Sequence, residues 1–127
     1  MMKNNISISV DLKKYRLRIH RNTLNALSVP KYVQLMINPE EMSLAICGTD
    51  KALAESHKVS LSQLNAEISY ELYSKKLMTE LCAIVPNLDK GKSYRLYGRK
   101  IAGEKVALFP MTSIQAIEKS KEDKIVR

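Results

Sequence analysis

The sequence has few cysteines, few histidines and no long apolar segment, and each shortage narrows the class of protein. Its two cysteines, Cys47 and Cys82, lie far apart, as in a protein of a reducing compartment and not a disulfide scaffold. His20 and His57 do not cluster with them at metal-ligand spacing, so neither a metal nor another cofactor is expected. No apolar run approaches the ~18 residues of a membrane span, and the first five residues lack the apolar region of a signal peptide. These features predict a cytoplasmic protein without membrane contact.

Glycine is also scarce, with four residues in the chain, and none belongs to a P-loop or a G-x-G-x-x-G motif. Gly91, Gly98 and Gly103 are interpreted instead as turn or bulge glycines. The sequence contains no Ser/His/Asp spacing and no pattern of paired carboxylates that would indicate a catalytic site. It therefore favours a binding protein over an enzyme.

What the sequence does contain is positive charge. Lysine and arginine outnumber aspartate and glutamate 21 to 13, which gives a formal net charge of +8 and a pI near 9.5. Residues 1–33 hold seven basic residues and one acid, Asp11, and residues 91–112 hold five basic residues and one acid, Glu104. Such segregation suits a surface that faces DNA, because lysine and arginine neutralise phosphates and release counterions.

Apolar and polar residues alternate along much of the chain, as they do in half-buried strands. Each half is expected to contain two strands, a short helix and two further strands. The expected strands are residues 6–10, 15–20, 32–37 and 44–47 in the first half and 59–61, 68–73, 93–99 and 106–109 in the second, and the expected helices are residues 24–27 and 75–85. The halves span about residues 6–48 and 57–110, and residues 113–127 form a helical or disordered tail.

The two halves match in pattern and order. The matched positions are Leu17 and Ile19 with Tyr70 and Leu72, Leu24 with Leu77, Leu35 with Leu96, and residues 44–46 with residues 106–108. One such unit buries too little apolar surface to be stable by itself. We therefore expect a single domain of mixed β class with short helices, in which the two units close on each other as one pseudo-twofold barrel.

The order of strand, short helix and β-hairpin resembles the swapped-hairpin barrels of the AbrB, SpoVT and MraZ type. The comparable stretches are residues 18–27 with 32–47 and residues 71–77 with 89–109. Proteins of this type are bacterial DNA-binding regulators or antitoxin components, and MraZ-like members carry two copies of the unit in one chain. The resemblance implies a regulator of transcription that binds duplex DNA.

Basic side chains recur at period two on one strand of each half. Arg16 and Arg18 project from one strand face, and Arg95, Tyr97 and Arg99 do so in the second half. An Arg-x-Arg strand can contact phosphates or reach base edges with bidentate guanidinium groups. The alternative is an ordinary solvated face whose arginine stems cover apolar neighbours. With their neighbours, the predicted DNA-binding residues are Arg16, Arg18, His20, Arg21, Lys31, Lys92, Arg95, Tyr97, Arg99 and Lys100.

A protein partner is the competing interpretation. Glu40 and Glu41 lie at the first hairpin tip, where a phosphate backbone would be repelled, and the Gly-Arg pair usual before the strand in AbrB-like proteins is absent. These features favour an accessory or inhibitor factor of a mobile element that targets a nucleic-acid-processing protein. In the DNA-binding case, a homodimer of barrels would lengthen the contacted site.

Overall fold

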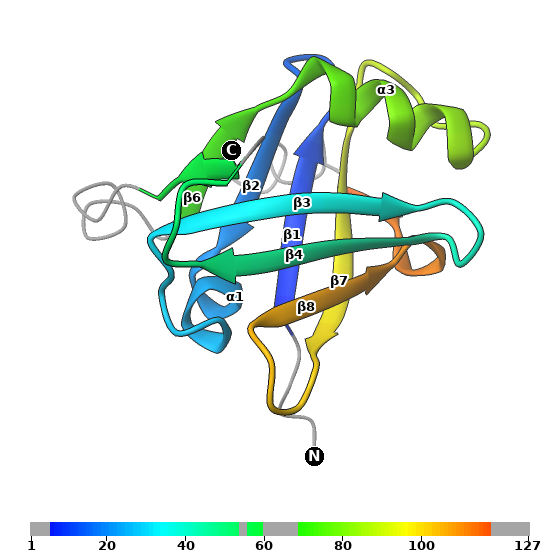
Figure 1. Cartoon of the computed structure of the whole chain (residues 1–127). Helices are drawn as coiled ribbons and strands as arrows, with labels where there is room; N and C mark the ends of the chain where they lie inside the picture. The colour runs from blue at the N-terminus through cyan, green and yellow to red at the C-terminus, as the bar shows by residue number, and fades with distance from the viewer. Residues whose placement is uncertain (1–5, 54–55, 60–68, 118–127) are drawn as a thin grey trace, which may run out of the picture.

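A computed structural model describes residues 6–53, 56–59 and 69–117 (Figure 1). The strands are β1 (Ile6–Asp11), β2 (Arg16–His20), β3 (Tyr32–Asn38), β4 (Ser43–Thr49), β5 (Ser56–Lys58), β6 (Ser69–Tyr73), β7 (Ser93–Lys100), β8 (Val106–Pro110) and β9 (Gln115–Ala116). The helices are α1 (Arg21–Ala26), α3 (Lys75–Ile84) and the 3-10 turn η1 (Met111–Ser113).

The strands form one antiparallel sheet that is nearly closed into a barrel. Their order is β5-β3-β4-β8-β7-β1-β2-β6, and β9 pairs with the start of β7. Strands β3, β4 and β8 form one wall, which crosses the wall formed by β1, β2 and β7 (Figure 1). The helix α3 lies at one end of the barrel and α1 at the other.

Strand alternation explains which residues fill the barrel. Along β1, Ile6, Ile8 and Val10 are buried, whereas Ser9 and Asp11 on the opposite face are only partly covered. The same alternation holds on the strands that pair with β1, because directly opposed residues point to the same side of a sheet. The largest fully buried side chains are Phe109, Ile8, Leu17, Ile19, Leu24, Leu27, Leu44, Ile46, Leu96, Met111, Val10 and Val33.

Strand β7 belongs to both walls of the barrel. Its first six residues pair with β1, and Arg99 and Lys100 pair with β8. Gly98 lies at the change, where an added Cβ atom would come within 2.1 Å of the carbonyl oxygen of Leu108 and 2.6 Å of the ring of Phe109. Glycine is required here because two parts of the chain approach closely.

The sequence located most of these elements. A mostly-β fold with two helices is confirmed. Ser74 caps α3, since its Oγ accepts the N–H of Leu77 at 3.1 Å. The short strand expected at 59–61 lies earlier, at Ser56–Lys58, and residues 60–68 lie outside the described part of the chain. Of the expected tail, residues 113–117 form the end of η1 and the strand β9, and residues 118–127 are not described.

Candidate nucleic-acid interface

Five of the ten predicted DNA-binding residues lie together on the outer side of β1, β2 and β7. Ser9 on β1 is opposite Arg18 on β2 and Arg95 on β7, so these three side chains form one row across the sheet. Glu71 on β6 extends that row, because it is opposite Arg18. We call this surface the arginine face, and its charged members are Asp11, Arg16, Arg18, Glu71 and Arg95.

Carboxylates compensate two of the three arginines on this face. The Nη2 of Arg16 lies 3.2 Å from Oδ2 of Asp11, and its Nη1 lies 3.8 Å from Oε1 of Glu71. Arg18 donates to Oε2 of Glu71 from both Nε, at 2.9 Å, and Nη2, at 2.6 Å. Arg95 has no such partner among the described residues, and its Nε is buried without a hydrogen bond.

His20 on β2 is neutral at physiological pH, and hydrogen bonds link its ring to two serines in the middle of the arginine face. Its Nδ1 lies 2.7 Å from the hydroxyl of Ser7, and its Nε2 lies 2.9 Å from the hydroxyl of Ser9. Burial, followed by the positive charges of Arg95 and Arg18, lowers the pKa of His20 to about 4. His20 therefore contributes hydrogen bonds to the arginine face and no charge.

The other predicted residues are distributed around this face. Tyr97, the fifth predicted residue of the face, is exposed farther along β7, and Arg99 is exposed where that strand joins the second wall. Lys100 donates from Nζ to the carbonyl oxygen of Ile101 at 3.2 Å. Arg21 is the exposed first residue of α1, and Lys31 and Lys92 are exposed residues that directly precede β3 and β7.

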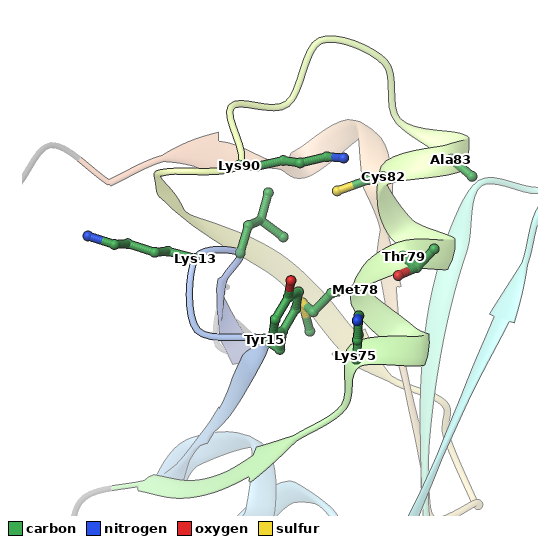
Figure 2. A pocket seen from close by; sticks show the side chains of 9 residues that line it. Lys13, Tyr15, Lys75, Met78, Thr79, Cys82, Ala83 and Lys90 are labelled. Atoms are coloured by element: carbon green, nitrogen blue, oxygen red, sulfur yellow. The ribbon is translucent and has the colours of Figure 1, made fainter.

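A second basic surface lies at the end of the barrel that carries α3. A hollow of about 580 Å³ separates the β1–β2 turn from α3 (Figure 2). Its floor is apolar, with Leu12 and Met78 buried, and the ammonium of Lys75 lies 5.7 Å from the centre of the Tyr15 ring. Lys90 points across the hollow toward α3, whereas Lys13 extends away from it. The lining residues are Leu12, Lys13, Tyr15, Lys75, Met78, Thr79, Cys82, Ala83 and Lys90.

Two neighbouring lysines extend this second surface, which we call the lysine end. Lys14 follows Lys13 in the β1–β2 turn, and the carbonyl oxygen of Lys92 accepts the N–H of Leu12 at 3.2 Å. Among the described residues, no ion pair involves any of its five exposed lysines. The members of the lysine end are Lys13, Lys14, Lys75, Lys90 and Lys92.

Two acids close in sequence to these lysines, Asp11 and Asp89, accept hydrogen bonds from backbone N–H groups. Oδ1 of Asp11 accepts the N–H groups of Lys13 and Lys14, at 3.1 and 3.3 Å, and Oδ1 of Asp89 accepts the N–H of Gly91 at 2.9 Å. These three hydrogen bonds shape the turns that display the lysines. The lysine end is thus a group of like charges without a carboxylate partner, an arrangement that self-repulsion disfavours unless an anion binds there.

Sequence reasoning found only Lys92 among these five lysines. The missing information was the packing of the β1–β2 turn against α3, which joins residues 13 and 14 to residues 75 and 90. The sequence did contain one indication of this surface, because Lys13 and Lys14 are consecutive lysines in a turn beside the basic strand β2.

Comparisons with protein family models, with curated proteins and with solved structures found no match. In the part of the chain that the structure describes, no three His, Cys, Asp or Glu residues are grouped as metal ligands. Within the same residues, no helix has the length and apolar character needed to cross a membrane.

Proposed function

We propose that this protein binds duplex DNA through phosphate contacts made by the lysine end. The observation that carries the proposal is the gathering of five exposed lysines, without a carboxylate partner among the described residues, around one end of the barrel. A lysine ammonium is a flexible point charge that suits phosphate oxygens. Contacts to the phosphate backbone supply most of the affinity of non-specific DNA binding.

We also propose that the barrel is a tandem duplication of the AbrB-like kind. Exchanging the first four strands with β5, β6, β7 and β8 turns each observed pairing among these eight strands into another observed pairing, except that β1–β2 would require β5–β6; the β7–β9 pairing has no counterpart. The bond from Leu12 N–H to the carbonyl of Lys92 has its counterpart in the bond from Val59 N–H to the carbonyl of Lys31, at 2.8 Å. In both, the donor directly follows the first strand of one half, and the acceptor directly precedes the third strand of the other.

The pattern of buried residues favours shifting one of the matches between the two halves by one residue. Leu44 and Ile46 are buried on β4, but their counterparts on β8 are Ala107 and Phe109. The earlier match to Val106 and Leu108 is therefore one residue out of step. With this shift, Ala45 and Leu108 become equivalent, and they are directly paired across β4 and β8. A duplicated barrel would place Lys31 and Lys92 symmetrically, as suits a duplex with two antiparallel strands.

Regulation of transcription is the role that the AbrB-like proposal implies for such a DNA-binding barrel. Phosphate contacts position a protein on DNA, whereas base-edge contacts give sequence preference. Tyr97 and Arg99 are the exposed side chains on β7 that we propose for base-edge contacts, because a phenol and a guanidinium group can both hydrogen-bond to base edges.

The proposal is tested by titrating the protein into a fluorescently labelled random duplex and measuring anisotropy at several salt concentrations. We expect micromolar or tighter binding at low salt, and a steep decline of the logarithm of affinity with the logarithm of salt concentration. Lack of binding at low salt would contradict the proposal.

One observation favours a protein partner as the second candidate. A groove of about 610 Å³ lies between β3 and α3, and its lining includes Leu35, Met36 and Leu77. Met36 is 46% exposed beside this groove, and an exposed methionine is a flexible apolar side chain that adapts to a protein partner. Glu40 and Glu41 lie exposed at the tip of the same hairpin. A stoichiometric complex with a nucleic-acid-processing protein, formed without DNA, would support this candidate.

A further inference from the structure

A small hollow on the arginine face has the size of a site for a single anionic group. Its volume is about 180 Å³, below the ~300 Å³ at which pockets for drug-sized ligands begin, but sufficient for several water molecules. It opens where Ser9, a short side chain, lies between two long ones, Arg18 and Arg95. The hollow is lined by Ser9, Val10, Asp11, Arg16, Arg18, Ser93, Arg95 and Ile117.

The charge around this hollow is not balanced. Three guanidinium groups line it or lie at its edge, and two carboxylates, Asp11 and Glu71, pair with Arg16 and Arg18. The positive charge of Arg95 remains without a carboxylate partner among the described residues. His20 beside it adds no charge, because burial and the positive charges of Arg95 and Arg18 lower its pKa to about 4.

A buried donor adds a geometric argument. The Nε of Arg95 is inaccessible to solvent and has no hydrogen-bond acceptor in the described structure. Buried polar groups are almost always hydrogen-bonded, and an exception requires an explanation such as an absent ion. A guanidinium group presents parallel N–H donors that match two oxygens of a phosphate. An oxyanion in the hollow would supply this acceptor once the Arg95 side chain turns toward it, because a water-sized probe does not reach Nε in the present conformation.

We propose that this hollow binds one phosphate group, with Arg95 as its principal ligand. Arg18 and Arg16 supply further positive charge from the neighbouring strand, and Asp11 and Glu71 hold these two side chains in place. The phosphate comes from one of two sources, a phosphodiester of bound DNA or a free phosphate or phosphate monoester. This site does not depend on DNA binding at the lysine end, because a free phosphate can be tested without DNA.

The first arm of the test titrates the full chain with inorganic phosphate at pH 7, with sodium chloride at equal ionic strength as reference. Isothermal titration and the thermal unfolding midpoint are the two readouts. We expect saturable binding and a higher midpoint in phosphate than in chloride. Arg95→Ala should lose at least tenfold in phosphate affinity, whereas Lys105→Ala, which removes an equal charge from an exposed residue outside the hollow, should bind as the wild type does. Equal effects of phosphate and chloride, or unchanged affinity in Arg95→Ala, would overturn the proposal.

Arg95→Lys keeps the charge but removes the fork of donors, and it serves as the second variant if Arg95→Ala does not fold. Its phosphate affinity should fall several-fold, and wild-type affinity in this variant would contradict the role of the guanidinium group.

The second arm measures DNA binding by anisotropy with the same variants and identifies the source of the phosphate. If Arg95→Ala weakens both phosphate and DNA binding, the hollow binds a backbone phosphate. If it weakens phosphate binding alone, the ligand is a free phosphate or monoester. Saturable phosphate binding by a protein that fails to bind DNA would leave this site standing while refuting the proposed function.

Discussion

The arginine face and the lysine end are both basic, but their charges are differently compensated. On the arginine face, Asp11 and Glu71 hold Arg16 and Arg18 at distances of 2.6 to 3.8 Å. At the lysine end, five exposed lysines have no ion pair among the described residues. A count of basic residues along the sequence therefore overstates the charge that the first surface offers to a polyanion. The lysines of the lysine end come from three separate segments of the chain, so the same count understates the charge that is gathered there.

The largest expected effect comes from Gly98, whose replacement should disrupt both surfaces together. Gly98 lies on β7, the strand that also carries Arg95. An alanine Cβ at this position would clash with the carbonyl oxygen of Leu108 at 2.1 Å. We expect Gly98→Ala to lower the free energy of unfolding by about 3 kcal/mol or more, because the obstacle includes backbone. Urea denaturation measures the loss. Gly91→Ala is the control, since its Cβ would meet only Oδ1 of Asp89 at 3.4 Å, and it should change stability by less than about 0.5 kcal/mol.

Neutralising the lysine end should give the next largest effect, on DNA affinity without loss of fold. For Lys75→Gln combined with Lys90→Gln, we expect roughly tenfold weaker binding or more at ~0.1 M salt, because two phosphate contacts are lost. Anisotropy titration of a labelled duplex measures the change. Wild-type affinity in this double variant would exclude the hollow beside α3 from the interface.

Acid should weaken the arginine face through His20. Its pKa is about 4 in the folded protein and near 6.5 in the unfolded chain, so the unfolded chain binds a proton first as the pH falls. The stability that neutral His20 provides is therefore complete above pH 6.5 and is lost between pH 6.5 and about 4. Allowing for partial solvent screening, we expect a loss of about 1–2 kcal/mol over this range.

Thermal unfolding at pH 7 and pH 5 checks this dependence. His20→Gln should flatten the part of the profile between these values, because glutamine keeps a polar side chain near Ser7 and Ser9 but does not titrate. An unchanged profile in that variant would assign the pH dependence to other groups.

The smallest effect should come from releasing the paired arginines. Glu71→Gln removes the carboxylate that holds Arg18, and the freed guanidinium group can reach a phosphate. We expect DNA affinity at low salt to rise about two- to threefold, while the free energy of unfolding falls by about 1 kcal/mol or less. Glu104→Gln changes net charge equally on the exposed β7–β8 turn and should leave both quantities nearly unchanged. Equal gains from the two variants would mean that net charge alone controls affinity.

Local patterns in the sequence predicted the strands well, because alternation such as Ile6, Ile8 and Val10 reflects one buried face. They also placed α3, since the helix expected at residues 75–85 is observed at Lys75–Ile84. Pairing partners were harder to predict. Nothing in β2 alone shows that Glu71, 53 residues later, lies opposite Arg18. The compensation of the arginine face thus depends on a long-range register that local periodicity does not encode.

The same reasoning explains why the lysine end was missed. Lys13 and Lys14 occupy a turn, Lys75 begins a helix and Lys90 lies in a loop, so these residues share no period and no motif. They meet only because the β1–β2 turn packs near α3. The one-residue shift that the proposed duplication requires on β8 has a similar origin, since Val106, Leu108 and Phe109 are all apolar and burial alone distinguishes which side faces inward.

The salt dependence of DNA binding in two charge-matched variants tests most directly whether the lysine end binds the phosphates. One carries Lys75→Gln and Lys90→Gln, the other Arg16→Gln and Arg18→Gln, and each loses two positive charges. We predict that the slope of log affinity against log salt becomes shallower by about two in the lysine variant and by less than about one in the arginine variant. A slope that changes more in the arginine variant, or equally in both, would contradict the claim that unpaired lysines bind the phosphates.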